Sequence, residues 1–242
     1  NGLITREEVI AQPKVAPVEK APLFVFSHGS GSIPEQSIFM TEYFASHGWI
    51  VVAPTHVGNT VAEGFNVTFE VALYRPQDIT ATLDYIDELP EDDPIGRRLT
   101  DNVLMSGHSF GGYTTFANAG AEYSIERLRR RCKSNETDSE ACEAFQETDS
   151  FPQVFDEGFE DDRIDVAIPQ APPGAEAFHT GLEKLDVPTM LFTGGIDKTL
   201  PNDKQGDPIW RFMAGPQHRR VHLPKGGHFT FSDACEFFGG QA

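Results

Sequence analysis

The stretch that decides the fold reads Val103-Leu104-Met105-Ser106-Gly107-His108-Ser109-Phe110-Gly111-Gly112. It holds Gly-x-Ser-x-Gly directly after an apolar, strand-like run and before a segment with helical spacing. A chain in that context turns sharply, so Ser109 is held in a strained conformation at the edge of a sheet. Gly107 and Gly111 have no Cβ to clash with the turn. The stretch therefore predicts a strand, a tight turn and a helix, with Ser109 as a nucleophile.

Short apolar runs and helical patterns alternate on both sides of this turn. The strands are predicted at 23–27, 49–53, 103–107, 164–168, 187–193 and 220–223, and the helices at 35–47, 76–89 and 113–123. This alternation predicts an α/β fold with a mostly parallel central sheet and helices on both faces. We expect a single domain over 1–242, in which the long segment 124–163 is a candidate lid or surface insertion.

Composition and charge exclude several classes of protein. The net charge of −18 disfavours contact with phosphate backbones and anionic lipid, so we expect no nucleic-acid partner. The longest apolar run, 49–53, is far shorter than the roughly 18–20 residues of a membrane span. We therefore expect no membrane span. A monomer is also expected.

A nucleophilic serine needs a base to take its proton and a carboxylate to orient that base. Among the eight histidines, His228 follows the last predicted strand in a glycine-rich loop, which can bring its imidazole over Ser109. Asp197 follows the fifth predicted strand, at the sheet end where open α/β folds place their sites. We therefore predict a triad of Ser109, Asp197 and His228.

Other residues near these positions are weaker candidates. Asp203 and Asp207 are the alternative carboxylates in the loop of Asp197. His222 lies within a predicted strand, so we expect a structural role for it. His108 is next to the nucleophile, but the geometry of the turn should point it away.

A developing oxyanion needs two N–H donors. The first is expected from Phe110, which follows the nucleophile at the beginning of a helix, where free N–H groups and the positive end of the helix dipole lie. The second is expected from the loop 27–32, which reads Ser-His-Gly-Ser-Gly-Ser. We predict Ser30 as this donor, with Gly29 and Gly31 as the alternatives.

The walls of the substrate pocket are predicted from loop residues near the strand ends. The chain has 19 Phe and five Tyr, which suits an apolar site. The candidates for substrate contact are Gly29, Phe65, Phe178 and Phe229, with Phe69 and Phe231 in similar places; core packing is the alternative for each phenylalanine. The acidic pairs at 92–93 and 161–162 have the charge to bind Ca²⁺, but a solvated surface explains them better. We predict no metal site and no cofactor.

The three cysteines bear on the cellular compartment. Cys132 and Cys142 flank a polar stretch and could close a loop disulfide, with three reduced thiols as the alternative. A disulfide implies an oxidising compartment. The chain begins at Asn1 rather than Met, so we expect removal or trimming of an upstream segment. We expect a secreted or periplasmic protein, with the cytoplasm as the alternative.

Taken together, His28-Gly29-Ser30, the turn at 107–112, Asp197 and His228 resemble the α/β-hydrolase superfamily. Two further stretches are similar to bacterial dienelactone-hydrolase-like proteins related to platelet-activating-factor acetylhydrolases. They read Pro54-Thr55-His56-Val57-Gly58-Asn59-Thr60 and Tyr74-Arg75-Pro76-Gln77-Asp78-Ile79. In that branch the turn often reads Gly-His-Ser-Phe-Gly-Gly and the second donor follows His-Gly, which agrees with Ser30. The resemblance spans about 22–231.

The sequence departs from this branch in two places. Dienelactone hydrolases proper use a cysteine nucleophile where this chain has Ser109, so the resemblance does not imply that activity. The family's first two strands should precede Leu23, but residues 1–21 are few and broken by proline. We therefore expect a sheet that lacks one or two of those strands.

The resemblance and the predicted triad together imply a serine carboxylesterase. It would cleave short- to medium-chain acyl esters through an acyl-enzyme, with a small-molecule or polymeric ester as substrate. A polyester hydrolase, or an acetylhydrolase of phospholipid-type esters, is a close variant. An amidase or peptidase with the same triad, and a non-catalytic binding protein on the same fold, are the remaining alternatives.

Overall fold

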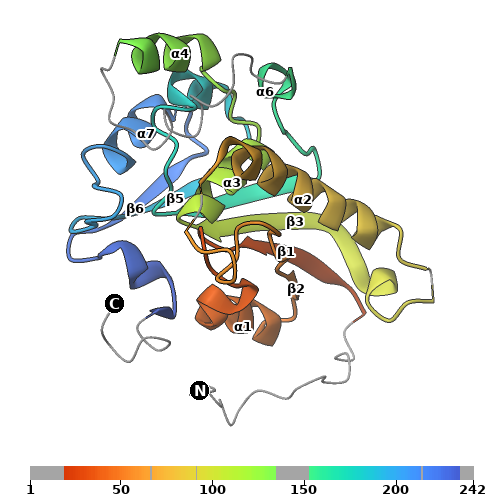
Figure 1. The fold of residues 1–242 in the computed structure, drawn as a ribbon. Helices are drawn as coiled ribbons and strands as arrows, with labels where there is room; N and C mark the ends of the chain where they lie inside the picture. The colour runs from red at the N-terminus through yellow and green to blue at the C-terminus, as the bar shows by residue number, and fades with distance from the viewer. Residues whose placement is uncertain (1–18, 66, 91, 135–152, 214, 235–242) are drawn as a thin grey trace.

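The computed structural model describes residues 19–65, 67–90, 92–134, 153–213 and 215–234. Its centre is a parallel sheet with the strand order β2-β1-β3-β4-β5-β6 (Figure 1). The strands are β1 (Ala21–Ser27), β2 (Ile50–Val52), β3 (Leu99–His108), β4 (Ile164–Gln170), β5 (Met190–Gly194) and β6 (Arg219–Leu223). Each lies at a predicted strand, and the parallel α/β sheet is confirmed.

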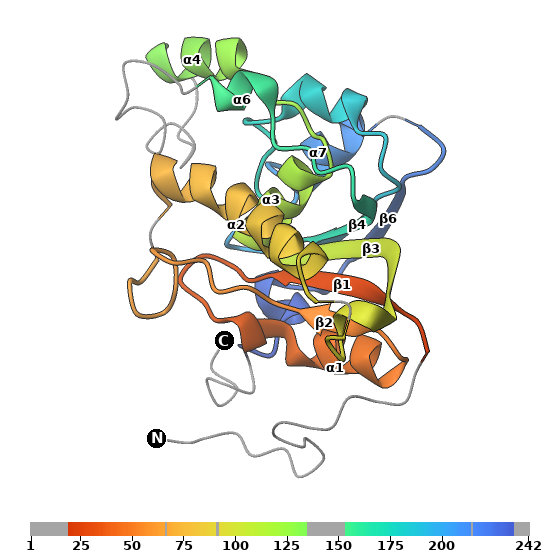
Figure 2. The ribbon, with the colours of Figure 1, turned by 90° about the vertical axis from the view of Figure 1, so that its right-hand side faces the viewer.

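Helices cover both faces of this sheet. They are α1 (Ile38–Ser46), α2 (Phe69–Asp87), α3 (Phe110–Asn118), α4 (Ile125–Lys133), α6 (Val154–Glu157) and α7 (Gly206–Phe212), with 3-10 helices at Pro34–Ser37, Gly96–Arg98, His179–Lys184 and His228–Phe231. Helix α1 lies on one face and α2 on the other (Figure 2). The predicted two-sided covering of the sheet is therefore confirmed.

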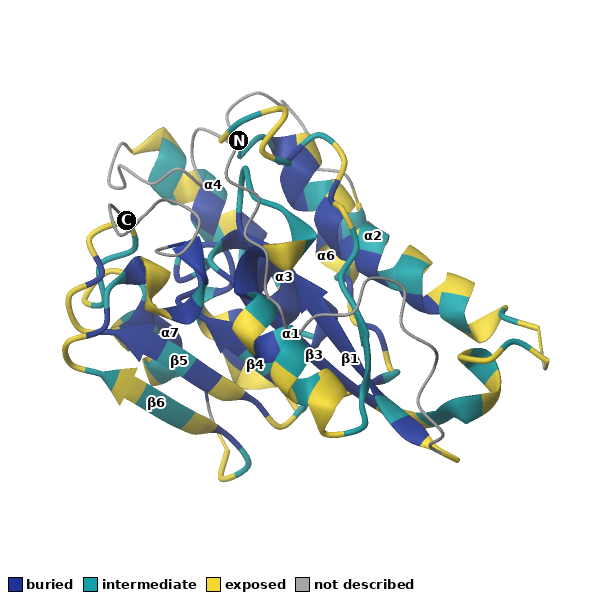
Figure 3. Cartoon of the chain, turned by 90° about the horizontal axis from the view of Figure 1, so that it is seen from below, coloured by how far each residue is buried: buried dark blue, intermediate teal, exposed yellow. Residues whose placement is uncertain are grey.

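Strand β1 shows why the sheet needs both layers. Its side chains alternate between the faces, so Val25 packs in the cluster under α2 and Phe24 in the cluster under α1. Both side chains are fully buried. The inner strands are mostly buried and the edge strand β6 is partly exposed (Figure 3). A continuous apolar run is thus the expected sequence of a central strand.

Helix α2 begins seven residues before the predicted boundary, with Pro76 inside it rather than at its start. The Thr68 side chain caps the true beginning by accepting a hydrogen bond from the Val71 N–H at 3.3 Å. Proline has no N–H for the carbonyl four residues earlier, Ala72. The Tyr113 hydroxyl donates to that carbonyl oxygen at 3.1 Å instead. This tertiary contact explains why the helix continues through Pro76.

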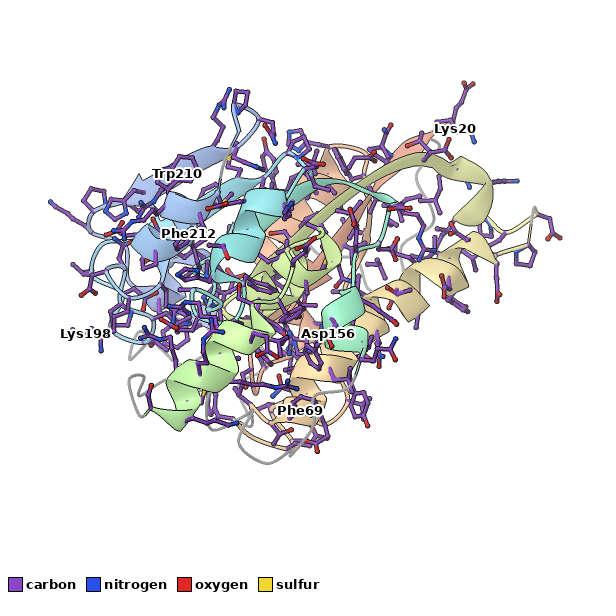
Figure 4. All side chains as sticks on the ribbon, turned by 90° about the horizontal axis from the view of Figure 1, so that it is seen from above. Lys20, Phe69, Asp156, Lys198, Trp210 and Phe212 are labelled. Atoms are coloured by element: carbon purple, nitrogen blue, oxygen red, sulfur yellow. The ribbon has the colours of Figure 1, made fainter. Side chains whose placement is uncertain are left out.

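The parallel strands bring their carboxyl ends to one edge of the sheet. Lys20 directly precedes β1 and marks the amino ends, whereas Lys198 follows β5 and marks the carboxyl ends. The two side chains lie on opposite sides of the molecule (Figure 4). The loops that follow β1, β3, β5 and β6 therefore meet at the edge that Lys198 marks.

The predicted excursion at 124–163 is described at its two ends, in α4 and α6. Leu128 of α4 and Phe155 of α6 are buried in the main core, so these ends belong to the packing of the domain. Residues 135–152 lie outside the described residues, and the lid stays a prediction. Cys132 is disulfide-bonded, and its predicted partner, Cys142, lies outside the described residues.

Two further expectations concern the limits of the chain. The expected loss of early strands falls on residues before 19, which lie outside the described part. Within the described residues, no helix has the length and apolar character that a membrane crossing requires.

The hydroxyl of Tyr113 is expected to stabilise the fold through the Ala72 carbonyl. Tyr113→Phe should lower the free energy of unfolding by about 1–3 kcal/mol, because a buried carbonyl loses its donor. In a Pro76→Ala background the cost should be smaller, since the new N–H can reach Ala72. Urea unfolding of the four proteins in this cycle measures the difference. An equal cost in both backgrounds would contradict the explanation.

Candidate active site

The predicted strained turn is present at Ser109, between β3 and α3. Ser109 has φ 54° and ψ −121°, in a region that residues with a side chain rarely adopt. Its N–H donates to the Gln170 carbonyl oxygen at 2.9 Å, and its own carbonyl accepts from the Gly112 N–H at 2.8 Å. The end of β4 and the first turn of α3 therefore hold the strained residue in place.

Gly111 allows this turn to rest directly on the end of β1. A Cβ at Gly111 would lie 1.9 Å from the Ser27 carbonyl oxygen, and one at Gly107 would lie 2.3 Å from the Gly111 carbonyl oxygen. Both neighbours are backbone atoms, which cannot rotate away. The two glycines are therefore required by close packing as well as by the turn.

The predicted base and carboxylate form a buried pair. The His228 Nδ1 lies 2.8 Å from the Asp197 Oδ2, and both side chains are almost fully buried. The other oxygen of Asp197 accepts from the N–H groups of Thr199 and Leu200 at 2.9 and 2.7 Å. Three donors thus surround the carboxylate and fix its orientation toward the imidazole.

The strand ends bring this pair to the turn of Ser109. Gly29, after β1, packs against Ser109, since a Cβ at Gly29 would lie 3.4 Å from the Ser109 Cβ. The His228 ring lies 4.7 Å, between centroids, from the ring of His108, the residue before Ser109. Within the described residues, Ser109 Oγ and His228 form no hydrogen bond. A hydrogen bond between a catalytic serine and its histidine is often long in the absence of substrate and shortens in the complex.

His108 connects the loop of His228 to the loop after β1. Its Nε2 lies 2.9 Å from the His228 carbonyl oxygen, and its Nδ1 lies 2.6 Å from the Gln36 Nε2. The Gln36 Oε1 accepts from the Gly29 N–H at 2.6 Å. Burial lowers the pKa of His108 to about 3, so the ring is neutral, and these partners assign the proton to Nε2. His108 therefore has a structural role. The Gly29 N–H is not free to bind an oxyanion, because it donates to Gln36.

The two predicted oxyanion donors lie at the beginning of α3 and in the loop after β1. The Phe110 N–H is the first of α3, and it has no acceptor among the described residues. The Ser30 Oγ accepts from the Asn59 Nδ2 at 3.0 Å, which holds the loop beside the turn. Because the Gly29 N–H already donates to Gln36, Gly29 is a weaker candidate for the second donor than Ser30 or Gly31.

A second chain of serine, histidine and aspartate lies beneath this loop. The His56 Nε2 lies 2.9 Å from the Ser27 Oγ, and its Nδ1 lies 2.8 Å from the Asp78 Oδ2. Ser27 and His56 have no exposed surface, so a substrate cannot reach this serine. Burial lowers the pKa of His56 well below its usual value, and the ring is neutral. This chain is therefore structural, although its distances are those of a catalytic triad.

Arg75 of α2 adjoins this chain and is also buried. Its guanidinium donates to the Ser27 Oγ at 3.0 Å, to the Asn59 Oδ1 at 2.7 Å and to the His28 carbonyl oxygen. Burial lowers its pKa to about 9, so it stays charged at neutral pH. Burial also raises the pKa of Asp78 to about 6. These side chains form a polar layer under the loop of Ser30.

The structure separates the candidate pocket residues into two groups. Phe65 is 88% exposed and its backbone packs on Gly31, beside Ser30. Phe229, next to His228, is 37% exposed. Phe178 has no exposed surface and stacks on Tyr113 in the core, where it cannot contact a substrate. Phe69 and Phe231 are buried as well.

The weaker candidates have other partners. The Asp207 carboxylate accepts from Arg220 at 2.7 Å, and this hydrogen bond lowers its pKa. Asp203 is exposed. The His222 Nδ1 lies 2.9 Å from the Thr193 Oγ1 between neighbouring strands, as its structural interpretation requires.

One member of each acidic pair forms hydrogen bonds within the fold. Asp161 accepts from Arg163, and Asp93 accepts from the N–H groups of Ile95 and Gly96. Among the described residues, no three His, Cys, Asp or Glu side chains are close enough to hold a metal ion.

A strained serine between a parallel strand and a helix, with a His–Asp pair on later loops, is typical of the α/β-hydrolases. The comparison with protein families agrees, because a model described as Chlorophyllase matches residues 5–128, just over half of the chain. The chain therefore belongs to the chlorophyllase family, a family of ester hydrolases of the α/β-hydrolase type. A search of curated proteins found no match. The likeness to dienelactone hydrolases and acetylhydrolases stays a prediction.

In the sequence, Arg75, Asn59 and Asp78 were noted only as parts of the two family-like stretches, and their contacts were not predicted. A signal was present, since Arg75 lies at helical spacing from Ala72 and Ile79 on the apolar face of α2. A charged residue on such a face is rare unless it has buried partners. Gln36 carried no comparable signal, because its partners are distant in the sequence.

Gly111→Ala is expected to abolish folding, because the new methyl group would overlap the Ser27 carbonyl group. Gly227→Ala is the matched control, since a Cβ there meets nothing within 4 Å and its φ is −92°. It should change the free energy of unfolding by less than about 1 kcal/mol. Soluble yield and thermal unfolding measure both variants. A Gly111→Ala protein with unchanged stability would contradict the packing described here.

Proposed function

We propose that this protein is a serine carboxylic ester hydrolase for short- to medium-chain acyl esters. The observation that carries the proposal is the buried His228–Asp197 pair on loops that converge on the strained Ser109. Family membership supports hydrolysis of esters as the reaction. The intact set of nucleophile, base and carboxylate argues against a non-catalytic binding protein.

The proposed reaction passes through an acyl-enzyme. The Ser109 Oγ attacks the ester carbonyl carbon while His228 Nε2 takes its proton, and Asp197 stabilises the imidazolium through Nδ1–H. The oxyanion accepts hydrogen bonds from the N–H groups of Phe110 and Ser30. When the C–O bond breaks, His228 gives its proton to the leaving alcohol.

Water then completes the cycle. It attacks the acyl carbon of the ester on Ser109 while His228 takes one of its protons. The tetrahedral intermediate collapses, the acid leaves, and His228 returns the proton to Ser109. Each turnover therefore consumes one ester and one water and yields one acid and one alcohol, so the reaction requires no other reactant.

Exposed apolar side chains around the site support an apolar, uncharged substrate. Phe65 and Val61 are 88% and 68% exposed in the segment that pairs with the loop after β1. Phe229 adds a partly exposed ring next to His228. The acidic charge of the chain needs no part in the chemistry, and it would act on solubility and on the approach of charged substrates.

The expected compartment and oligomeric state are part of the same proposal. The disulfide at Cys132 supports a secreted or periplasmic enzyme, because such bonds persist in oxidising compartments. A monomer is the expected oligomeric state.

Replacement of the nucleophile tests the proposal most simply. Ser109→Ala should lower kcat/KM for p-nitrophenyl butyrate by at least about 10⁴-fold, because the attacking oxygen is lost. Ser46→Ala, an exposed serine on α1, is the matched control and should leave kcat/KM unchanged. Undiminished hydrolysis by Ser109→Ala, or no hydrolysis by the wild type, would refute the esterase proposal.

The length of the acyl chain defines the substrate class. In a series of p-nitrophenyl esters from acetate to palmitate, kcat/KM should fall beyond about eight carbons, because an acyl chain longer than its pocket clashes with the pocket wall. Chlorophyll, the substrate in the family's name, is assayed beside the series. Retained activity on palmitate would exclude the preference for short and medium chains.

A further inference from the structure

Arg75 is a charged side chain in the interior, with only 1% of its surface exposed. Its Nε donates to the Thr114 Oγ1 of α3 at 3.1 Å. One terminal nitrogen donates to Asn59, and the other donates to the Ser27 Oγ and the His28 carbonyl oxygen. The planar guanidinium thus joins α2 to α3, to the end of β1 and to the loop after β2.

The first path from Arg75 to the site runs through Asn59. The Asn59 Oδ1 accepts from Arg75 at 2.7 Å, and its Nδ2 donates to the Ser30 Oγ at 3.0 Å. The bond to the His28 carbonyl fixes the same loop from its other end. Arg75 therefore restrains the loop of the second oxyanion donor at two points.

The second path runs through Phe110. The Arg75 guanidinium lies over the Phe110 ring, with 5.1 Å from Cζ to the ring centroid. A cation over an aromatic face attracts it, and the attraction grows when water is excluded. Phe110 also supplies the first proposed donor through its N–H. Arg75 therefore contacts Phe110 itself and the loop that carries Ser30.

The charge of Arg75 is balanced indirectly. Among the described residues, no carboxylate lies within ion-pair distance of it. Instead, the Ser27 Oγ accepts from Arg75 and faces the His56 Nε2, and the His56 Nδ1 faces the Asp78 carboxylate. The second Ser–His–Asp chain therefore connects the buried cation to a partly exposed anion.

A buried cation held in this way is costly, because its desolvation is repaid only through well-aligned hydrogen bonds. An apolar residue of similar size would pack the same helix face at less cost. We propose that Arg75 is a positioning residue that holds both oxyanion donors, Ser30 and Phe110, in register with Ser109. This inference rests on the proposed function and assigns part of its rate to a residue that touches no substrate.

Arg75→Lys tests the inference, because lysine keeps the charge but cannot reproduce the planar fork. Activity is measured on p-nitrophenyl butyrate and divided by the sites titrated to completion with a fluorophosphonate. The per-site kcat should fall by about 10–100-fold, somewhat less than the loss of a whole oxyanion donor, with KM within threefold. The inhibition constant of phenylboronic acid, which forms a tetrahedral adduct, should rise by a similar factor.

Arg163→Lys is the matched control. Arg163 binds Asp84 and Asp87 at the other end of α2, and its replacement should leave per-site kcat and the boronate constant within twofold of the wild type. A structural role for Arg75 would lower the number of titrated sites without changing the chemistry of each. A per-site kcat and boronate constant within twofold in Arg75→Lys would overturn the inference.

Ser30→Ala decides the matter if Arg75→Lys does not fold. This variant keeps the backbone N–H donor but removes the Oγ that Asn59 binds. A lower per-site kcat with a weaker boronate complex supports the inference. Unchanged values overturn it. Ser109→Ala is measured in parallel. Its continued activity would refute the proposed function, whereas an inactive Ser109→Ala beside a normal Arg75→Lys would refute only the role of Arg75.

Discussion

The contact between Gly111 and the Ser27 carbonyl group sets the geometry on which the rest of the site depends. Because no side chain separates them, the turn of Ser109 and the end of β1 lie in direct backbone contact. The loop of Ser30 leaves β1 at that point, so the proposed nucleophile and a candidate oxyanion donor share one rigid frame. The strain at Ser109 can persist because this packing and the bond to Gln170 hold it.

Two buried polar networks extend this frame in opposite directions. On one side, Gln36 and His108 connect the Gly29 N–H to the carbonyl of His228. On the other side, Arg75 binds the loop of Ser30 and lies over Phe110. Burial keeps the His108 ring neutral, and both of its ring nitrogens already have partners in this network. The proposed catalytic geometry, built from loops on four strands, is held by residues to which the proposal gives no chemical step.

Much of the fold could be predicted from local patterns, and the contacts between distant segments could not. The turn at Ser109 and the six strands follow from glycine spacing and apolar runs, and His228 and Asp197 follow from their places after strands. The predicted beginning of α2, at Pro76, was wrong. The Tyr113 hydroxyl donates to the Ala72 carbonyl in place of the N–H that Pro76 lacks, and the helix extends back to Phe69. Phe178 was wrongly predicted to line the pocket, because the sequence does not show whether a phenylalanine near a strand end faces a pocket or packs in the core. The partners of Arg75 could not be predicted, since they come from three segments that are distant in the sequence: α3, the end of β1 and the loop after β2.

Two Ser–His–Asp arrangements lie among the described residues, and only the one at Ser109 is proposed to react. The Ser27 Oγ lies within hydrogen-bond distance of the His56 ring, whose other nitrogen faces Asp78, but Ser27 and His56 are closed to solvent. Ser109 is strained and partly exposed, and a His–Asp pair lies on neighbouring loops. Peptide mapping by mass spectrometry after reaction with a fluorophosphonate distinguishes them directly. We expect one adduct, on the peptide that contains Ser109; an adduct on another serine, or none on the folded protein, would refute Ser109 as the nucleophile.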